Sequence, residues 1–490
     1  MGKSIWKALY DTPYTTQTAV SLGGKSLTYS NLKKSAMLFC DKLHSIGIKK
    51  GDVVTIALPN TIESIIAFYG INAKGAIANM VHPSLPNYNL KLIQEDTHSK
   101  LLVGLPHHVA TTRKITCMTT ESDVTGWDNF MKTPSSPSIY EDSDRVSVYL
   151  HSGGTTDKPK TIVLSSSNFN SLANDLAKLF YDGECVGYKS LTILPTFHGF
   201  GLGAGIHTLL MLGAELVLVP KFDKLQTPDL IVDKKINMVL GVPSVFSSIL
   251  ASKKIQESQD LSFVKHCFVG GDSASPTLLS DFNSLLSSKR SDCKLCQGYG
   301  LTECVSVVTV NSRQNYRIGS VGKPLSTIDI GIDCGGKFAP ANTIGEICVS
   351  GNIVMKRYLN GTKKTFTSSD GKVWLKTGDY GYLDQDGYCY FVDRKKRIAK
   401  VSGVTVFPKE VEKLLSSYHG IRDCFVKQGK NKKLVAYVVK TPESNLNEKI
   451  IIDYLKSHLM KWAVPERVVF LDYFPTTTIG KIDINNEIFD

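Results

Sequence analysis

The sequence lacks a cysteine framework and any long uninterrupted apolar run. Its 11 cysteines are odd in number and are scattered from Cys40 to Cys424 without regular spacing, which argues against disulfides that hold the fold together. The longest apolar stretch, residues 199–220, is interrupted by His207 and Glu215 and contains five glycines, so we predict a buried helix followed by a strand and no membrane span. We therefore expect a cytoplasmic protein with reduced thiols.

Low-complexity tracts, internal repeats and an extreme composition are absent as well. Hydrophobic residues make up 42% of the chain and charged residues 21%, which is ordinary for a globular protein and excludes a disordered or fibrous one. The 490 residues are too many for one ordinary core and suggest about three domains, at roughly 100 to 200 residues each. Only the net charge of +12 is unusual, and it suits nucleic acid, a membrane surface or a polyanionic small molecule.

Segments with strand and helix patterns alternate from Leu27 onward. A helix that Ser30 is expected to cap is followed by a strand at residues 52–58, and Asn60 is expected to cap the next helix. The alternation recurs through the first half of the chain and predicts α/β layers around largely parallel sheets. Short strands punctuated by Gly and Asp then predict a mostly antiparallel subdomain at about residues 319–393.

A compact unit of alternating strands and helices follows a charged stretch, and we place a domain boundary there. The expected division is an N-terminal domain at residues 1–393, a hinge at 394–397 and a small α+β domain at 398–490.

The strongest local signal is the run at residues 152–160, which follows an apolar strand at residues 146–150. It combines small and hydroxyl residues with a closing Pro and Lys. Its backbone amides, the hydroxyls of Thr155 and Thr156 and the charge of Lys160 suit a triphosphate. The run is not a Walker A loop, and taken alone it is equally compatible with a flexible surface turn.

This run resembles the phosphate loop of the acyl-adenylate-forming superfamily, and further segments resemble the motifs of that superfamily in the expected order. The chain is most similar to acyl-CoA synthetases and 4-coumarate-CoA ligase-like enzymes, from about residue 27 to residue 481. The resemblance implies a large AMP-binding N-terminal domain and a small mobile C-terminal lid. The segments that carry it are the adenine motif at 297–303, the ribose motif at 376–379, the hinge at 393–396, the start of the lid at 400–412 and the catalytic-lysine motif at 475–481.

The resemblance implies sites for ATP and coenzyme A. Tyr299, placed between two glycines, would stack its ring on adenine, and Asp379 together with Arg394 would bind the ribose hydroxyls. Lys396 would be the hinge residue about which the lid turns. The binding residues that the resemblance implies are Ser152, Gly153, Gly154, Thr155, Thr156, Lys160, Gln297, Gly298, Tyr299, Asp379, Arg394, Lys396, Lys400, Ser402 and Gly403. The last three would lie along the tunnel for the pantetheine arm of coenzyme A.

The resemblance also implies the catalytic residues. Thr302 would meet the α-phosphate, and the carboxylate of Glu303 would bind the Mg²⁺ that accompanies ATP. Lys481 would bridge the substrate carboxylate and the α-phosphate and neutralise the charge that develops there. His198 lies in a segment that resembles the lining of the acyl pocket and would lie near the carboxylate, although a lone histidine is more often structural.

An ATP-dependent acid-thiol ligase is the function that these motifs imply. The acid would first form an acyl-adenylate with release of pyrophosphate, and coenzyme A would then take the acyl group. Phe197 and His198 offer no carboxylate to hold an α-ammonium group, so we expect a carboxylic acid without one. The residues expected around it, which suit a fatty or an aryl acid, are Phe197, Phe200, Val242, Val245, Phe246, Gly270 and Gly271.

Two departures from the motifs and three alternatives stay open. Asp157 stands where the superfamily usually has glycine and adds a negative charge to the phosphate loop, and Thr161 replaces the glycine after the loop lysine. The alternatives are a homologue that binds nucleotide without catalysis, a ligase that loads an acyl carrier protein, and a nucleic-acid-binding protein. Because residues 394–490 carry 18 Lys or Arg and 11 Asp or Glu, the excess charge is better explained as a basic lid for phosphorylated ligands, and no nucleic-acid partner is expected.

Overall fold

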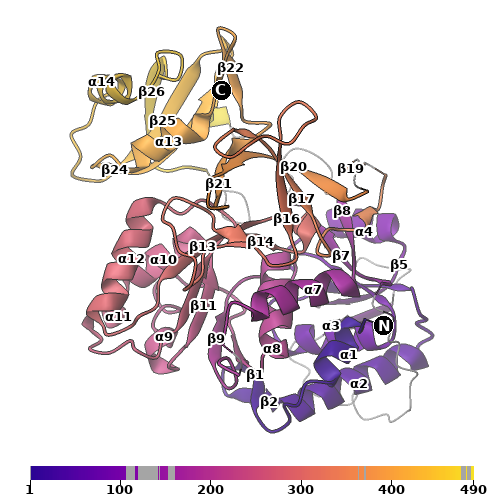
Figure 1. The fold of residues 1–490 in the computed structure, drawn as a ribbon. Coiled ribbons are helices and arrows are strands. Elements are labelled where there is room, and N and C mark those ends of the chain that lie inside the picture. Colours follow the sequence, from indigo (N-terminus) through magenta and orange to yellow (C-terminus); the bar gives the residue numbers. More distant parts are fainter. Residues whose placement is uncertain are drawn as a thin grey trace.

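The computed structural model describes most of the chain. It covers residues 2–105, 116–119, 142, 144–152, 160–181, 183–361, 364–368, 371–475, 482 and 487–489, with the backbone alone at 116–119. Figure 1 shows a large lower part, coloured from indigo to orange, and a small upper part formed by the C-terminal elements in yellow. The large part contains two extensive sheets and an antiparallel one, and the small part contains a three-stranded sheet, a two-stranded hairpin and two helices.

The first extensive sheet has seven strands in the order β18-β8-β7-β4-β3-β5-β6, and its pairs from β7 to β6 are parallel. Every residue of β3 is buried, as expected for a strand that is covered on both faces by helices. The strands are β3 (Val53–Ala57), β4 (Ile77–Met80), β5 (Ser99–Gly104), β6 (Thr116–Thr119), β7 (Val146–His151), β8 (Thr161–Ser165) and β18 (Arg357–Tyr358). The helices of this region are α1 (Ile5–Tyr10), α2 (Tyr29–Ser45), α3 (Ile62–Ala73), α4 (Asn87–Thr97) and α7 (Ser166–Ala177).

The second extensive sheet has nine strands in the order β15-β14-β13-β12-β11-β9-β10-β1-β2, with parallel pairs from β13 to β1. The predicted α/β class is therefore confirmed. The strands are β1 (Thr18–Leu22), β2 (Lys25–Thr28), β9 (Lys189–Thr192), β10 (Glu215–Leu218), β11 (Met238–Gly241), β12 (His266–Val269), β13 (Leu295–Gly300), β14 (Val307–Val310) and β15 (Lys323–Pro324). The helices are α9 (Leu230–Asp233), α10 (Pro243–Ala251), α11 (Lys253–Glu257), α12 (Pro276–Ser288) and the 3₁₀ turn η2 (Thr302–Cys304).

Two helices start differently from the prediction. Thr28, not Ser30, caps α2, and Thr61, not Asn60, caps α3. In both cases a threonine hydroxyl accepts the backbone N–H three residues on, which satisfies a helix-end donor. Asn60 instead uses its side-chain amide to donate to the backbone carbonyl of Leu194, which ties α3 to the segment after β9.

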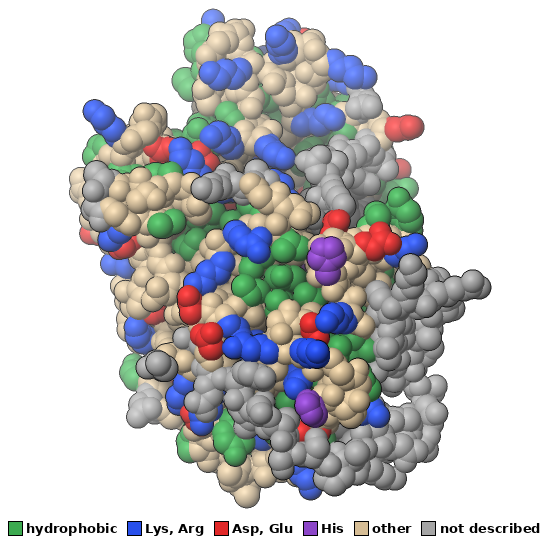
Figure 2. Space-filling view, turned by 90° about the vertical axis from the view of Figure 1, so that its right-hand side faces the viewer, with side chains coloured by type: hydrophobic (Ala, Val, Ile, Leu, Met, Phe, Trp, Pro, Cys, Tyr) green, Lys and Arg blue, Asp and Glu red, His purple; other side chains and the backbone are tan. Residues whose placement is uncertain are grey.

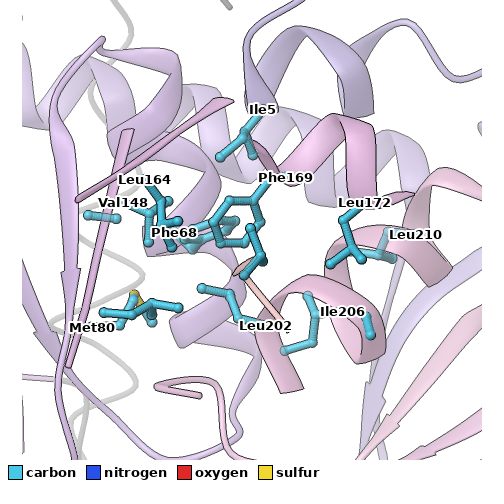
Figure 3. Close-up of a cluster of buried hydrophobic side chains, with 14 of the residues drawn as sticks. Ile5, Phe68, Met80, Val148, Leu164, Phe169, Leu172, Leu202, Ile206 and Leu210 are labelled. Atoms are coloured by element: carbon cyan, nitrogen blue, oxygen red, sulfur yellow. The ribbon is translucent and has the colours of Figure 1, made fainter. Parts of the chain in front are cut away.

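The apolar stretch at residues 199–220 forms a buried helix followed by β10, as predicted. The first part is a π-helix, η1 (Phe200–Thr208), which continues into α8 (Leu209–Met211). Figure 3 shows Leu202 and Ile206 of η1 among buried side chains from other helices and strands, including Phe169 of α7. One face of this helix therefore belongs to the hydrophobic core.

The antiparallel sheet predicted near residues 319–393 is present, and the C-terminal unit follows it. All pairs of this five-stranded sheet are antiparallel. Its strands are β16 (Asp329–Asp333), β17 (Gly345–Ser350), β19 (Thr365–Thr367), β20 (Val373–Leu383) and β21 (Cys389–Arg394). The C-terminal elements are β22 (Ala399–Val401), β23 (Val404–Val406), α13 (Pro408–Ser416), β24 (Ile421–Gln428), β25 (Leu434–Lys440), α14 (Glu448–His458), β26 (Arg467–Leu471) and η3 (Glu487–Phe489).

The C-terminal elements bury a hydrophobic cluster of their own, in which Val411 and Leu415 of α13 pack with Val426, Val438 and Leu455. A separate core is what an independently moving domain requires. The exact division at residues 393 and 397 and the motion itself stay predictions.

Some expected absences can be checked on the described residues. Within them, no helix combines the length and the apolar character needed to cross a membrane. Each cysteine whose side chain is described carries a free thiol, and most of these thiols are buried. On the face that Figure 2 shows, Lys and Arg side chains are spread among acidic and apolar ones rather than gathered in a single area.

Candidate active site

A large cavity of about 1110 Å³ is lined by residues from both extensive sheets, from the antiparallel sheet and from the segment after β21. Its lining has two parts of different chemistry. The polar part includes Tyr299, Glu303, Tyr358, Lys364, Asp379 and Arg394. The apolar part includes Phe200, Ala204, Leu209, Leu240, Val242 and Phe268.

Most of the predicted site residues that the structure describes meet at this cavity. Those that line it are Ser152, Lys160, His198, Gly298, Tyr299, Thr302, Glu303, Asp379, Arg394 and Lys396. Gln297 is buried on β13 and is not part of the lining, and its backbone carbonyl accepts the N–H of Asn311. Gly153, Gly154, Thr155, Thr156 and Lys481 lie outside the described residues, as does Asp157. The roles expected for all of these residues stay predictions.

Tyr299 and Asp379 form the centre of the polar part. Tyr299 lies near the end of β13, and its hydroxyl donates to Asp379 Oδ2 over 2.8 Å. Asp379 faces Arg394 across the β20–β21 pair, with 3.6 Å between Asp379 Oδ1 and Arg394 Nε. Burial raises the pKa of the Asp379 carboxyl, whereas Arg394 and the Tyr299 hydroxyl oppose that rise. The arrangement presents a flat ring and a carboxylate side by side, which suits a base and the hydroxyls of a ribose.

A second polar cluster, which we call the Glu303 corner, consists of Glu303, Tyr358, Lys160 and Lys364. Glu303 lies in η2, and its Oε1 accepts from the Tyr358 hydroxyl over 2.5 Å and lies 3.7 Å from Lys364 Nζ. The ammonium groups of Lys160 and Lys364 lie 5.4 and 6.0 Å from the centre of the Tyr358 ring. One carboxylate and two cations thus meet at one end of the cavity, where a magnesium-bound polyphosphate would find both hard oxygen and positive charge.

The turn after Glu303 is held in an uncommon conformation. Val305 has a φ of 60°, which is rare for a β-branched residue and clusters at functional sites in proteins. Its carbonyl points at Gly199, where an added Cβ would lie 1.5 Å from the oxygen. The glycine before η1 is therefore required by the strained turn that carries Glu303.

His151 was not singled out by the sequence, yet it joins the two ends of the phosphate-loop run. It ends β7, its Nε2 lies 2.7 Å from Asn79 Oδ1, and its Nδ1 lies 3.3 Å from the Thr161 hydroxyl. Burial lowers the pKa of His151 to about 4, so the ring is neutral. Ser152 and Lys160 are joined by two further hydrogen bonds, of 3.0 and 3.1 Å. Thr161, which departs from the motif, therefore helps to close the base of the run.

His198 lines the cavity together with a second histidine that sequence reasoning missed. The rings of His82 and His198 flank that of Phe197, with centroid distances of 4.5 and 4.8 Å. Burial lowers the pKa of His82. His82 follows the carboxyl end of the parallel strand β4, and that position is the signal that could have identified it.

The apolar part is formed largely by one face of the η1–α8 helix. Phe200, Ala204, Thr208 and Leu209 line the cavity, and Ala204 and Leu209 also belong to the hydrophobic core that Leu202 and Ile206 enter. No side chain that this helix, β11, β12 or α10 contributes to the described lining carries a charge. Phe246, which was expected here, lies in the core instead, edge-on to Phe282 at 5.2 Å, so that expectation was wrong. The apolar part suits an uncharged substrate group.

The hinge region lines the cavity, whereas the β22–β23 hairpin does not. Lys396 lines it, and the neighbouring Lys395 donates its N–H to Gly378 over 2.9 Å, so this segment is held against β20. Lys400, Ser402 and Gly403 belong to the hairpin and are not among the lining residues. Ser402 and Gly403 have φ values of 50° and 83°, so the tight turn gives a second reason for glycine at this position. Their contact with coenzyme A stays a prediction.

Two protein-family models match this chain, and the first covers most of the residues that line the cavity. The family described as AMP-binding enzyme matches residues 8–359, and the AMP-binding enzyme C-terminal domain matches residues 410–481.

Individual relatives match over nearly the full length. A long-chain-fatty-acid–CoA ligase of Bacillus subtilis (strain 168) is 28% identical over 98% of this chain and 93% of its own. The 4-coumarate–CoA ligase 2 of Petroselinum crispum is 30% identical over 94% of this chain and 88% of its own.

Solved structures share the fold. The ATP-bound MatB of Rhodopseudomonas palustris superimposes with a TM-score of 0.90 at 22% identity over 100% of both chains. The o-succinylbenzoate coenzyme A synthetase MenE of Bacillus subtilis, in complex with AMP, superimposes with a TM-score of 0.83 at 25% identity over 99% of this chain and 98% of the other.

Proposed function

The chain belongs to the family of AMP-binding enzymes, and on this premise we propose that it is an ATP-dependent ligase that joins an apolar carboxylic acid to coenzyme A. The observation that carries the proposal is a single cavity in which Tyr299 and Asp379 adjoin an uncharged apolar part. Relatives of nearly equal length are ligases that join acids to coenzyme A, which supports the same reaction class.

The reaction proceeds in two steps. An oxygen of the substrate carboxylate bonds to the α-phosphorus of ATP, and the bond from that phosphorus to the bridging oxygen breaks, so that pyrophosphate leaves and an acyl-adenylate remains. The sulfur of coenzyme A then bonds to the acyl carbon, its proton is lost, and AMP leaves. Tyr299 and Asp379 hold the adenosine throughout, and Thr302 donates to the α-phosphate.

The Glu303 corner fits the magnesium ion that ATP carries. Mg²⁺ prefers oxygen ligands and is commonly held by one or two carboxylates together with substrate phosphates. The carboxylate of Glu303 is such a ligand, and the Tyr358 hydroxyl orients it. When bound, the ion would neutralise phosphate charge.

The acid is expected to be fatty or aryl. The wall formed by η1, β11, β12 and α10 offers no charged partner for an α-ammonium group or a second carboxylate. Two relatives are named as ligases for a long-chain fatty acid and for 4-coumarate, and both acids are uncharged beyond the carboxylate. His198, beside Phe197, would face the carboxylate end of the acid.

Exchange of radioactive pyrophosphate into ATP tests the first step directly. We expect exchange with fatty or aryl acids and none with amino acids or with no acid. Thioester formation with coenzyme A, in competition with purified acyl carrier proteins, tests the second step. ATP binding without exchange for any acid would contradict the ligase and favour the non-catalytic homologue, and preference for a carrier protein would favour the other alternative.

Residues 398–490 are proposed to turn about Lys396 between the two steps. Lys481→Ala is then expected to abolish exchange while thioester formation from a supplied acyl-adenylate is retained. Loss of both steps in a folded variant would contradict the lid assignment.

A further inference from the structure

Lys364 is a cation of the cavity that none of the sequence motifs singled out. It immediately precedes β19, and its backbone carbonyl accepts the N–H of Lys376 over 2.9 Å, so the antiparallel sheet holds its backbone. Its Nζ lies 3.7 Å from Glu303 Oε1 and its side chain, 34% exposed, lines the cavity. The ammonium group is therefore presented to the cavity from a fixed point of the backbone.

The fold brings Lys364 and Lys160 to the same tyrosine, Tyr358, although the two lysines are far apart in the sequence. Lys160 directly precedes β8, and Tyr358 of β18 pairs with Ile162 of β8. The buried Tyr358 ring has both ammonium groups near it, at 5.4 and 6.0 Å from its centre. Strand pairing thus places the two lysines at one ring.

The charges at the Glu303 corner are unequal. Among the described residues of this corner, Glu303 can neutralise one of the two lysines, which leaves one positive charge. A ligand with several negative charges would be held by both ammonium groups, because hydrogen bonds between charged groups are the strong ones. Lys364 also opposes the burial that raises the pKa of the Asp379 carboxyl, which is consistent with its lying on the nucleotide side of the cavity.

We propose that Lys364 is a further phosphate-binding residue, which together with Lys160 holds the β- and γ-phosphates of ATP and the pyrophosphate formed from them. This proposal rests on the proposed function, which identifies the nucleotide as ATP. It adds one contact to that function, between Lys364 and the pyrophosphate that leaves in the first step. AMP, the acyl-adenylate and coenzyme A do not carry this pyrophosphate, so the second step does not use Lys364.

The test compares Lys364→Met and Lys364→Arg with a matched control. Lys372→Met removes a lysine of the same sheet that pairs with Asp329 over 2.7 Å and does not line the cavity. We expect Lys364→Met to weaken the apparent binding of ATP and of pyrophosphate by about 10- to 100-fold, as for a hydrogen bond between charged groups. Binding of AMP and thioester formation from a supplied acyl-adenylate are expected to be unchanged, and Lys364→Arg to retain most pyrophosphate binding.

Equal effects of the Lys364 and Lys372 substitutions, or parallel losses of AMP and pyrophosphate binding, would overturn the proposal. Calorimetric titration of each variant with magnesium pyrophosphate measures the phosphate site without the ligase reaction. It therefore distinguishes failure of the Lys364 proposal from failure of the proposed ligase function. If the unaltered chain binds pyrophosphate through Lys364 but shows no exchange, the ligase is contradicted and the phosphate site is retained. If the unaltered chain and Lys364→Met both exchange pyrophosphate into ATP at the same rate, only the proposal for Lys364 is contradicted.

Discussion

The two parts of the cavity are built in different ways. The polar part is assembled by side chains from three sheets: Tyr299 comes from the nine-stranded sheet, Asp379 from the antiparallel sheet and Tyr358 from the seven-stranded sheet. The apolar part is mainly one face of η1, whose other face, with Leu202 and Ile206, is hydrophobic core (Figure 3). Polar side chains can therefore be changed singly with little effect on folding, whereas the apolar wall is also the core.

A buried neutral histidine stabilises each part. His151 lies at the base of the phosphate-loop run, and His207 lies in η1, where its Nδ1 is 3.1 Å from the Tyr69 hydroxyl and its Nε2 is 2.9 Å from Asn170 Oδ1. In this respect the two parts are alike, since both need an uncharged imidazole.

The largest effect is expected from Gly199→Ala. The added Cβ would lie 1.5 Å from the Val305 carbonyl oxygen, so the backbone must shift at the start of η1. We expect the free energy of unfolding to fall by about 4 kcal/mol or more. Urea denaturation measures this. Gly205→Ala is the control in the same helix, because its Cβ would meet only the Phe200 carbonyl oxygen at 3.5 Å. Equal stability of the two variants would contradict the conclusion that the apolar wall of the cavity is also part of the hydrophobic core.

Acidification is expected to destabilise both parts together. Burial lowers the pKa of His151 to about 4 and that of His207 to about 3, from an ordinary value of 6.5. The unfolded chain binds these protons more tightly, so stability is full above pH 6.5 and falls as the pH drops toward these values. Each histidine contributes about 1.4 kcal/mol per pH unit in that window.

Urea denaturation across this pH range tests whether protonation of His151 and His207 causes the loss of stability. His151→Gln is expected to reduce the slope of the free energy of unfolding against pH by about one proton. An unchanged slope in the His151 variant would show that this imidazole is not the group that titrates.

Asp379→Asn is expected to separate function from stability in the polar part. Loss of a charged hydrogen-bond acceptor for ribose should reduce kcat/KM for ATP by roughly 10- to 100-fold. Because burial raises the pKa of this carboxyl, its ionised form lowers stability at neutral pH, and that penalty disappears as the pH falls below the raised pKa. The variant should therefore have an unchanged or higher Tm. Asp386→Asn, in an exposed turn, is the control for kinetics.

The smallest effect is expected in the apolar part, from Ala204→Leu. The larger side chain enters the cavity, so the preference for short over long acids should rise by about tenfold, while KM for ATP stays the same. Initial rates over a chain-length series measure this ratio, with Gly205→Ala as the control. A uniform loss for all acids would mean that residue 204 acts on folding rather than on selectivity.

Much of the fold and of the polar part could be predicted from the sequence. Alternating patterns identified the α/β layers and the antiparallel strands, and Tyr299, Glu303 and Asp379 stand in recognisable motifs and meet in one cavity. The missed residues have no such pattern. Lys364 carries no local signal, and His151 becomes meaningful only beside Asn79.

The sequence by itself determined the local elements and the kinds of chemical group available, because helix and strand periodicity and end-capping act between residues close in the chain. Only the tertiary structure decided which groups meet. The pairing of β18 with β8 places Tyr358 and Lys160 at the corner with Glu303, and the packing of Gly199 against Val305 fixes the turn beside them. Such contacts depend on strand order and on close packing between distant segments, neither of which a local pattern specifies.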